Sequence, residues 1–133
     1  MEAQHIDIAQ ASLDVAHEGS LSFPEIVGML AEAGFESYLV DYRCETQTFY
    51  RSDSGHVVLP RHLEGGAVSA DFDAVAIAGL VAWARENGPD YSYREFGART
   101  RAAGCAGYLV SIPGRRAVYF GRSGETHVEH FPR

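Results

Sequence analysis

Apolar residues recur at helical spacing in four stretches of the chain. The first runs over about residues 6–18 and the third over about residues 72–87, each with apolar side chains every three or four positions. The second and fourth begin at Ser22 and Ser92, and each serine is followed three residues later by a glutamate. That spacing is typical of an N-terminal capping box. The pattern therefore predicts four helices in two pairs.

Short runs with alternating apolar and polar residues follow each pair. Gly34 and Gly104 precede these runs, and a glycine in the left-handed conformation commonly closes a helix. The alternation predicts strands over residues 37–44, 46–51 and 56–59, and over 107–112, 116–121 and 126–131. Each half thus has the order helix, helix, three strands. We expect an α+β fold in which one or more antiparallel sheets pack against four helices.

The two halves also match residue by residue at an offset of 70. Tyr38-Leu39-Val40 falls on Tyr108-Leu109-Val110, and after one inserted residue His56-Val57 falls on His127-Val128. Self-similarity at a fixed offset indicates a tandem duplication. The predicted organisation is a single domain, 1–133, made of two pseudo-symmetric repeats, 1–60 and 71–133, joined by a glycine-containing linker, 61–70.

Length and composition fit a protein that folds around one core. The chain has 133 residues, of which 46% are hydrophobic, and it starts without the basic and apolar segments of a signal peptide. Its longest uncharged apolar stretch, Ala74 to Ala84, is too short to span a bilayer. Cys44 and Cys105 lie outside any C-x-x-C pair, which suits a reducing compartment. We expect a cytoplasmic protein with no membrane partner.

Charged residues are distributed unevenly along the chain. The net charge of −7 argues against nucleic-acid binding, which needs a surplus of cations. Residues 1–84 hold thirteen acids and three arginines, net −10, whereas residues 85–133 hold five acids and eight arginines, net +3. Either the two halves attract each other when they dock, or the second half contains an anion site.

A cleft between the halves is the expected place for such a site. Arginines suit carboxylate and phosphate groups, and those of the second half either converge on an anion or form a solvated face. The residues predicted to bind ligand are Arg99, Arg115 and Arg122, with a tyrosine lining from Tyr38, Tyr50, Tyr108 and Tyr119.

Asp41 and His127 are the candidate catalytic residues. Asp41 shares a side of its predicted strand with Leu39, and the matching position in the second half is Ser111. A carboxylate on an apolar side needs a partner or a cavity. Asp41 and His127 would suit acid/base catalysis without a cofactor. The alternative is a structural hydrogen bond from Asp41 to a tyrosine or arginine.

Metal chemistry has weaker support in the sequence. His127 and Glu129 share one side of a predicted strand, while His130 points to the other. Two ligands do not make a metal site, so no metal and no cofactor are predicted. Cys105 follows a helix end and matches Phe35 in the first half, which favours a buried structural thiol.

Motifs along the chain resemble a bacterial family of unknown function, the YbcV-like or YdfO-like family, often labelled "phage envelope protein". Its motifs match Phe23-Pro24-Glu25, Ala33-Gly34, Tyr38-x-Val40-Asp41, Ala103-Gly104-Cys105, Gly107-Tyr108, Gly114-Arg115-Arg116, Tyr119-Phe120-Gly121-Arg122 and His127-x-Glu129-x-Phe131-Pro132. Phe49-Tyr50-Arg51 departs from the family pattern. The resemblance implies a small duplicated α+β fold of prophage and chromosomal genes, and it transfers no catalytic residue.

Two functional hypotheses follow. The leading one is a small-molecule site between the halves that takes a partly apolar anion, because Asp41 and the second-half arginines differ between the two copies. The alternative is a non-catalytic interaction module or homodimer of prophage origin, in which a tyrosine-rich sheet meets a partner.

Overall fold

The computed structural model describes residues 1–62 and 66–132 of the chain. Its elements are α1 (Ala3–Glu18), α2 (Phe23–Glu32), β1 (Phe35–Asp41), β2 (Thr46–Arg51), β3 (His56–Pro60), α3 (Ala74–Glu86), α4 (Tyr93–Ala102), β4 (Cys105–Ser111), β5 (Arg116–Gly121) and β6 (Thr126–His130). The order helix, helix, three strands occurs twice, which confirms the predicted α+β class. Residues 63–65, inside the predicted linker 61–70, lie outside the described part.

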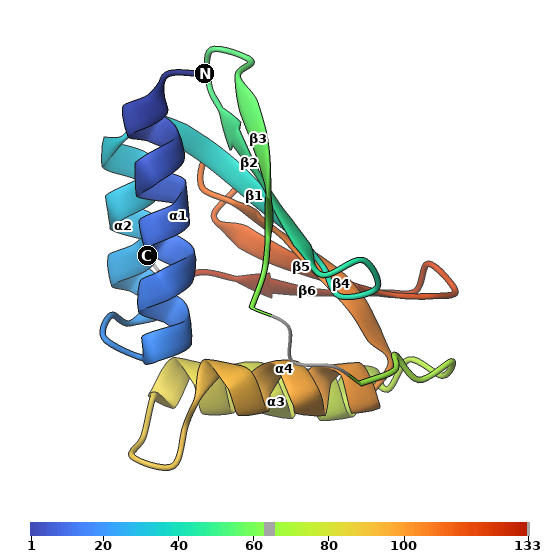
Figure 1. The fold of residues 1–133 in the computed structure, drawn as a ribbon. Coiled ribbons are helices and arrows are strands. Elements are labelled where there is room, and N and C mark those ends of the chain that lie inside the picture. Colours follow the sequence, from blue (N-terminus) through green and yellow to red (C-terminus); the bar gives the residue numbers. More distant parts are fainter. Residues whose placement is uncertain (63–65, 133) are drawn as a thin grey trace.

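All six strands belong to one antiparallel sheet with the order β3-β2-β1-β4-β5-β6 (Figure 1). The two halves meet at its centre, where β1 pairs with β4 and Leu39 lies directly opposite Leu109. The sequence left open whether the halves form one sheet or two. Backbone hydrogen bonds between β1 and β4, the first strands of the two halves, join the halves into a single sheet.

The bounds of α2 and of the three strands differ by 70 residues from those of their counterparts in the second half. β3 covers His56–Pro60 and β6 covers Thr126–His130, so His56 corresponds to Thr126 and Val57 to His127. The inserted residue predicted before His127 is therefore wrong. Tyr50 pairs with His56 and Phe120 pairs with Thr126, which gives both hairpins the same register. The shared His-Val dipeptide suggested an alignment that is shifted by one residue. The hairpin pairing sets the register, and it does not follow residue identity here.

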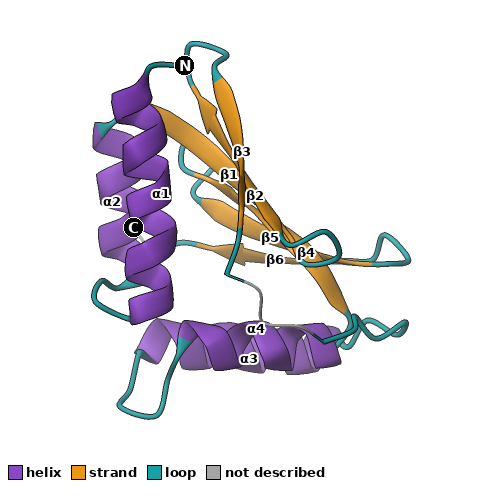
Figure 2. Ribbon diagram, viewed as in Figure 1, coloured by secondary structure: helices purple, strands orange, loops and turns teal. Residues whose placement is uncertain are grey.

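Both helical pairs lie on the same side of the sheet (Figure 2). Alternate strand residues such as Tyr38, Val40 and Tyr42 are buried against these helices on what we call the inner face. Leu39 and Asp41 alternate with them and point to the opposite, outer face, where they are half-buried. Asp41 thus shares a face with Leu39, as predicted, but the expectation that this face is the buried apolar one is wrong, because the helices cover the other face.

Helix ends follow the sequence signals closely. Ser22 Oγ accepts a hydrogen bond from the Glu25 amide at 3.4 Å, and Glu25 Oε1 accepts one from the Ser22 amide at 2.9 Å, so the first capping box is complete. Ser92 Oγ likewise accepts from the Glu95 amide at 3.1 Å. The Glu95 carboxylate accepts a hydrogen bond from Arg99 Nε, at 3.1 Å. Within the described residues, no helix is long and apolar enough to cross a membrane.

Candidate functional site

Five tyrosines meet between the inner face of the sheet and α4. Tyr108 lies at their centre: its ring centroid is 6.4 Å from that of Tyr38, 6.1 Å from that of Tyr42 and 5.1 Å from that of Tyr119. The fifth, Tyr93, begins α4, and its hydroxyl oxygen is 2.7 Å from that of Tyr108. Strand alternation and the β1–β4 and β4–β5 pairings place Tyr38, Tyr108 and Tyr119 on one face, and Tyr42, directly after β1, continues the same alternation. We call these five residues the tyrosine cluster.

Two arginines reach the tyrosine cluster from elements outside the sheet. Arg61 follows β3, and its guanidinium carbon lies 5.1 Å from the ring centroid of Tyr42 and 5.7 Å from that of Tyr93. Arg101 belongs to α4 and lies 5.2 Å from the Tyr42 centroid. Arg61 is only 8% exposed and Arg101 only 3%. Both are therefore buried cations that stack on aromatic rings, an arrangement that is strongest when water is excluded.

One carboxylate oxygen lies between the two guanidinium groups. Glu45 Oε1 is 3.0 Å from Arg61 Nη1 and 3.9 Å from Arg101 Nη1. Arg61 Nη2 also donates to the Tyr93 hydroxyl at 3.3 Å. Glu45 comes from the β1–β2 turn, where its backbone carbonyl accepts a hydrogen bond from the Arg61 amide at 2.9 Å. The β1–β2 turn and Arg61 are therefore held together by a main-chain hydrogen bond and by a side-chain ion pair.

Hydrogen bonding of the two arginines is incomplete. Arg61 Nε, Arg101 Nε and Arg101 Nη1 are buried and have no hydrogen-bond partner in the part of the chain that the structure describes. A buried donor left unpaired costs about 1–3 kcal/mol, and more when it is charged. The described residues therefore supply more buried donors here than acceptors. We call Arg61, Arg101, Glu45, Tyr42 and Tyr93 the arginine–tyrosine centre.

Protonation states in the centre follow from burial. Burial raises the pKa of Tyr42 and of Tyr108 well above the ordinary tyrosine value, and the nearby Tyr93 oxygen raises both further. Burial lowers the pKa of Arg61, but the oxygens of Tyr93, Tyr108 and Tyr42 raise it, and the result lies above the usual arginine value. At neutral pH Tyr42 and Tyr108 are therefore neutral and Arg61 is a cation. The centre can hold an anion by charge and by N–H donors.

Three of the four tyrosines predicted to line a ligand site lie close together. Tyr38, Tyr108 and Tyr119 all belong to the tyrosine cluster. Tyr50 lies on the outer face, 37% exposed, with its ring centroid 6.4 Å from that of His56. The structure brings three of the four predicted tyrosines together because they share the inner face, and it separates Tyr50 from them by the thickness of the sheet.

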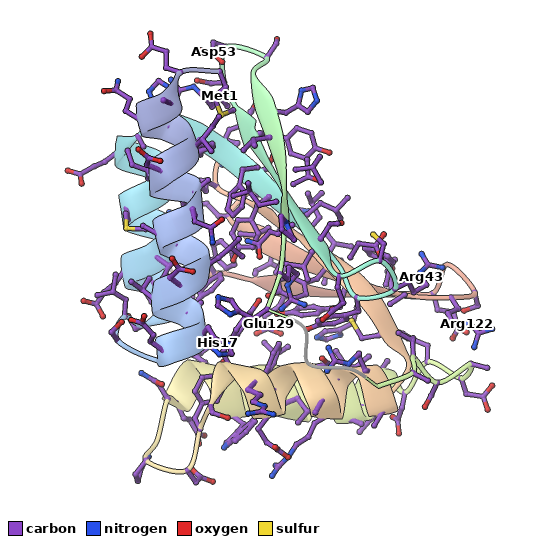
Figure 3. The ribbon with its side chains drawn as sticks, in the orientation of Figure 1. Met1, His17, Arg43, Asp53, Arg122 and Glu129 are labelled. Atoms are coloured by element: carbon purple, nitrogen blue, oxygen red, sulfur yellow. The ribbon has the colours of Figure 1, made fainter. Side chains whose placement is uncertain are left out.

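The three predicted arginines do not come together. Arg99 lies 4.7 Å from the ring centroid of Trp83, on the surface of α4. Arg115 Nη2 donates to the Pro132 carbonyl at 2.7 Å. Arg122 lies at the tip of the β5–β6 hairpin, away from the body of the molecule, and Nη1 donates to the Val68 carbonyl at 3.3 Å (Figure 3). Within the described residues, none of the three has a hydrogen bond or ring contact to the arginine–tyrosine centre.

Asp41 has a structural partner in its own turn. Its Oδ1 accepts hydrogen bonds from the backbone amides of Arg43 at 2.9 Å and Cys44 at 3.3 Å. Ser111, at the matching position, accepts from the Gly114 amide at 2.9 Å. Two different side chains thus perform the same turn-stabilising task. Turn hydrogen bonding therefore explains why the two copies can carry different residues, Asp41 and Ser111, at this position.

His127 lies on the inner face at the edge of the tyrosine cluster. Its Nε2 is 3.3 Å from Glu129 Oε2, and its ring centroid is 6.4 Å from that of Tyr119. Glu129 also pairs with Arg85 of α3 (Figure 3). Asp41 points to the outer face, so the structure does not bring it together with His127. Their catalytic assignment stays a prediction. Among the described residues there is no group of three or more potential metal ligands.

The sequence contained a signal for some of the residues that build the centre. Arg101 follows Phe96, Gly97 and Thr100 at helical spacing, and all four are buried, so the periodicity placed Arg101 on the inner side of α4. Tyr42 continues the alternation of Tyr38 and Val40. The signal for Arg101 was missed because arginine is normally assigned to the surface. For Glu45 and Arg61, which leave the regular elements, the sequence offers no comparable signal.

The chain is similar to uncharacterized proteins of mycobacteria. It is 30% identical over 112 residues to uncharacterized protein Rv2012 of Mycobacterium tuberculosis and to uncharacterized protein Mb2035 of Mycobacterium bovis. The alignment covers 82% of this chain and 66% of each relative, so the chain spans slightly less than two thirds of their length. No family model matches the chain. The resemblance to the YbcV-like family therefore stays a prediction.

Proposed function

We propose that this protein binds a small anionic ligand at the arginine–tyrosine centre. The observation that carries the proposal is Arg101, which is 3% exposed and has two guanidinium nitrogens without a hydrogen-bond partner within the described residues. Buried cations in proteins are normally paired and fully hydrogen-bonded. An oxyanion placed beside Arg101 and Arg61 supplies the acceptors that these donors lack.

Chemistry and space indicate the class of ligand. Carboxylate and phosphate oxygens are the acceptors that arginine binds most strongly, and the rings of Tyr42 and Tyr93 give the site aromatic walls. Both guanidinium groups are nearly enclosed, which favours a small ligand. Open surface hollows of about 460 Å³ and about 290 Å³ occur elsewhere, one beside Arg51 and the other between α1 and α2, and neither is lined by residues of the centre.

The proposed site differs in two respects from the one that the sequence suggested. The ligand-binding arginines are Arg61 and Arg101 in place of Arg99, Arg115 and Arg122, and the predicted tyrosines Tyr108 and Tyr119 support the site from the sheet. Acid/base catalysis by Asp41 and His127 is not part of it, because Asp41 Oδ1 is engaged by its own turn.

Thermal unfolding in different anions tests the proposal. At constant ionic strength, with chloride as reference, we expect inorganic phosphate, acetate or benzoate to raise the melting temperature by several degrees. A ligand at 100 times its Kd stabilises the folded state by about 2.7 kcal/mol. If none of the three anions stabilises the protein relative to chloride, this site does not bind the proposed class of ligand.

A pair of variants on one helix separates binding from structure. Arg101→Met removes the buried charge at similar volume, and Arg99→Met removes an exposed charge two residues earlier. Arg101→Met should abolish the anion-dependent stabilisation, and without anion its stability should equal or exceed that of the wild type, because unpaired buried donors are lost. Arg99→Met should respond to anions like the wild type. Equal responses of both variants would contradict the proposal, as would severe destabilisation of Arg101→Met in chloride.

A further inference from the structure

Glu45 limits the positive charge of the arginine–tyrosine centre. Its side chain is 14% exposed and lies between the guanidinium groups of Arg61 and Arg101. The two guanidinium groups carry two positive charges and the carboxylate carries one negative charge, so these three side chains together have a charge of +1. A singly charged anion would balance this charge. A doubly charged anion would leave a buried negative charge, which is costly.

Glu45 offsets the charge of the two arginines without occupying all their donors. Its Oε1 is 3.0 Å from Arg61 Nη1, which is a hydrogen-bonding distance, but 3.9 Å from Arg101 Nη1, which is not. Arg101 Nε and Nη1 therefore have no hydrogen-bond partner among the described residues. The donors that remain and the charge that remains both lie at Arg101. An anion beside Arg101 would use both.

The backbone that holds Glu45 is present in both copies of the repeat. Arg115 corresponds to Glu45 at the offset of 70, and both residues have a positive φ, 54° for Glu45 and 52° for Arg115. The Arg61 amide donates to the Glu45 carbonyl at 2.9 Å, and the Phe131 amide donates to the Arg115 carbonyl at 2.8 Å. The same turn thus forms with a glutamate or with an arginine. Backbone geometry does not explain why the first copy has a carboxylate here.

The second copy has aromatic rings where the centre has an arginine on a tyrosine. Phe131 corresponds to Arg61 and Phe23 corresponds to Tyr93. The rings of Phe131 and Phe23 pack edge to face with their centroids 5.5 Å apart. The fold therefore accepts apolar side chains at these positions. Buried charges in one copy alone favour a role in binding over a role in folding.

We infer that Glu45 makes the centre selective for a singly charged anion, so that the ligand is a monocarboxylate in preference to a doubly charged phosphate. The inference rests on the proposed function, because it concerns the ligand of the same site. Glu45 is a specificity-determining residue: it does not contact the anion, and its charge disfavours a second negative charge beside the arginines. Inorganic phosphate near pH 7 is a mixture of singly and doubly charged ions and binds through the singly charged one.

Methyl sulfate and methyl phosphate are matched probes of ligand charge, because they have nearly the same shape. The second pKa of a phosphate monoester is about 6, so at about pH 8 methyl phosphate carries two charges. Methyl sulfate carries one. Thermal unfolding at constant ionic strength, with chloride as reference, gives the Kd of each ion from its concentration dependence. The wild-type protein should bind methyl sulfate more tightly than methyl phosphate.

Three variants show whether Glu45 sets this preference. Glu45→Gln removes the charge and keeps an oxygen that can accept from Arg61, and it should shift the ratio of the two Kd values at least about tenfold in favour of methyl phosphate. Glu45→Asp keeps the charge on a shorter side chain and should keep the wild-type preference. Glu36→Gln removes an equal charge from an exposed residue of β1 and should leave the ratio unchanged.

The outcomes distinguish this inference from the proposed function. An unchanged ratio in Glu45→Gln, or an equal shift in Glu36→Gln, would overturn the role of Glu45, while anion binding stands if Arg101→Met abolishes it. Tighter binding of methyl phosphate by the wild type would also overturn the inference, whether or not Glu45→Gln folds. If neither probe nor acetate stabilises the wild type more than Arg101→Met, the proposed function fails and the inference fails with it.

Discussion

Gly107 is the residue at which the two halves of the sheet approach most tightly. A Cβ atom on it would lie 2.2 Å from the Val40 carbonyl oxygen and 2.8 Å from the Phe120 ring. Val40 belongs to β1, the strand of the first half that pairs with β4. Phe120 covers the space that a side chain would occupy. The junction between the halves is therefore built for a residue without a side chain.

Gly107→Ala should destabilise the protein by about 2–4 kcal/mol, because backbone at both sides of the central pairing must move. Gly28→Ala is the matched control: Gly28 lies within α2 with no atom near its potential Cβ. An alanine there should stabilise the protein by about 0.5–1 kcal/mol, the usual difference in a helix interior. Urea unfolding of both variants measures the two effects. Similar stability of both would show that the close approach to Val40 is tolerated.

At the level of elements, α2 and α4 begin at equivalent residues but are capped differently. Ser22 and Glu25 exchange both hydrogen bonds of the capping box. Ser92 accepts its bond from the Glu95 amide, whereas the Glu95 carboxylate pairs with Arg99. Glu25 has a lowered pKa because the Ser22 amide and then the Ser22 hydroxyl donate to its carboxylate. The same three-residue spacing thus supports two different sets of side-chain contacts.

Ser22→Ala and Ser92→Ala should each cost about 1 kcal/mol of folding free energy, the typical value of an N-cap. Only Ser22→Ala should also change the acid dependence of stability. The lowered pKa of Glu25 gives stability at neutral pH that is lost as pH falls through the folded-state pKa. Ser22→Ala should remove the part of this loss that the Ser22 hydroxyl causes, while the amide of residue 22 still donates to Glu25. Urea unfolding between pH 7 and about pH 3 compares the two variants. Parallel curves would contradict the different capping described here.

At the scale of the whole molecule, the tyrosine cluster joins both halves of the chain. Tyr38 comes from β1 and Tyr42 directly follows it, Tyr108 and Tyr119 come from β4 and β5, and Tyr93 from α4. Burial raises the pKa of Tyr38, Tyr42, Tyr108 and Tyr119 above the ordinary value. Cys105 lies in the same core, and burial raises the pKa of its thiol to about 11. The centre of the molecule is therefore rich in acids that stay protonated while the fold persists.

Stability should fall as pH rises above about 9–10, where tyrosine and cysteine ionise in the unfolded chain but stay protonated in the folded one. The unfolded state then binds fewer protons, so the free energy of unfolding decreases with pH. Tyr119→Phe should weaken this dependence, whereas Tyr50→Phe, on the exposed outer face, should leave it unchanged. Urea unfolding at several alkaline pH values measures the slopes. A Tyr119→Phe protein with the wild-type slope would contradict the assignment of Tyr119 to the protected group.

The sequence by itself determined the local structure of this protein. Capping serines, closing glycines and alternating strands depend on neighbouring residues, so all ten elements are predictable from short segments, and strands β2 and β5 match their predicted bounds. It also determined that tyrosines of both halves fall on equivalent strand positions. Local preference could not fix which side of β1 the helices cover, and Asp41 was assigned to the wrong face for that reason.

Only the tertiary structure decided how distant segments combine. The β1–β4 pairing joined the halves into one sheet, and it created both the tyrosine cluster on the inner face and the pairing of Leu39 with Leu109 on the outer face. Glu45 and Arg61 lie outside the regular elements, and they meet Arg101 through long-range packing that no local pattern encodes. Burial changes an arginine from a solvated surface group into a cation that requires a partner, and burial is a property of the whole fold.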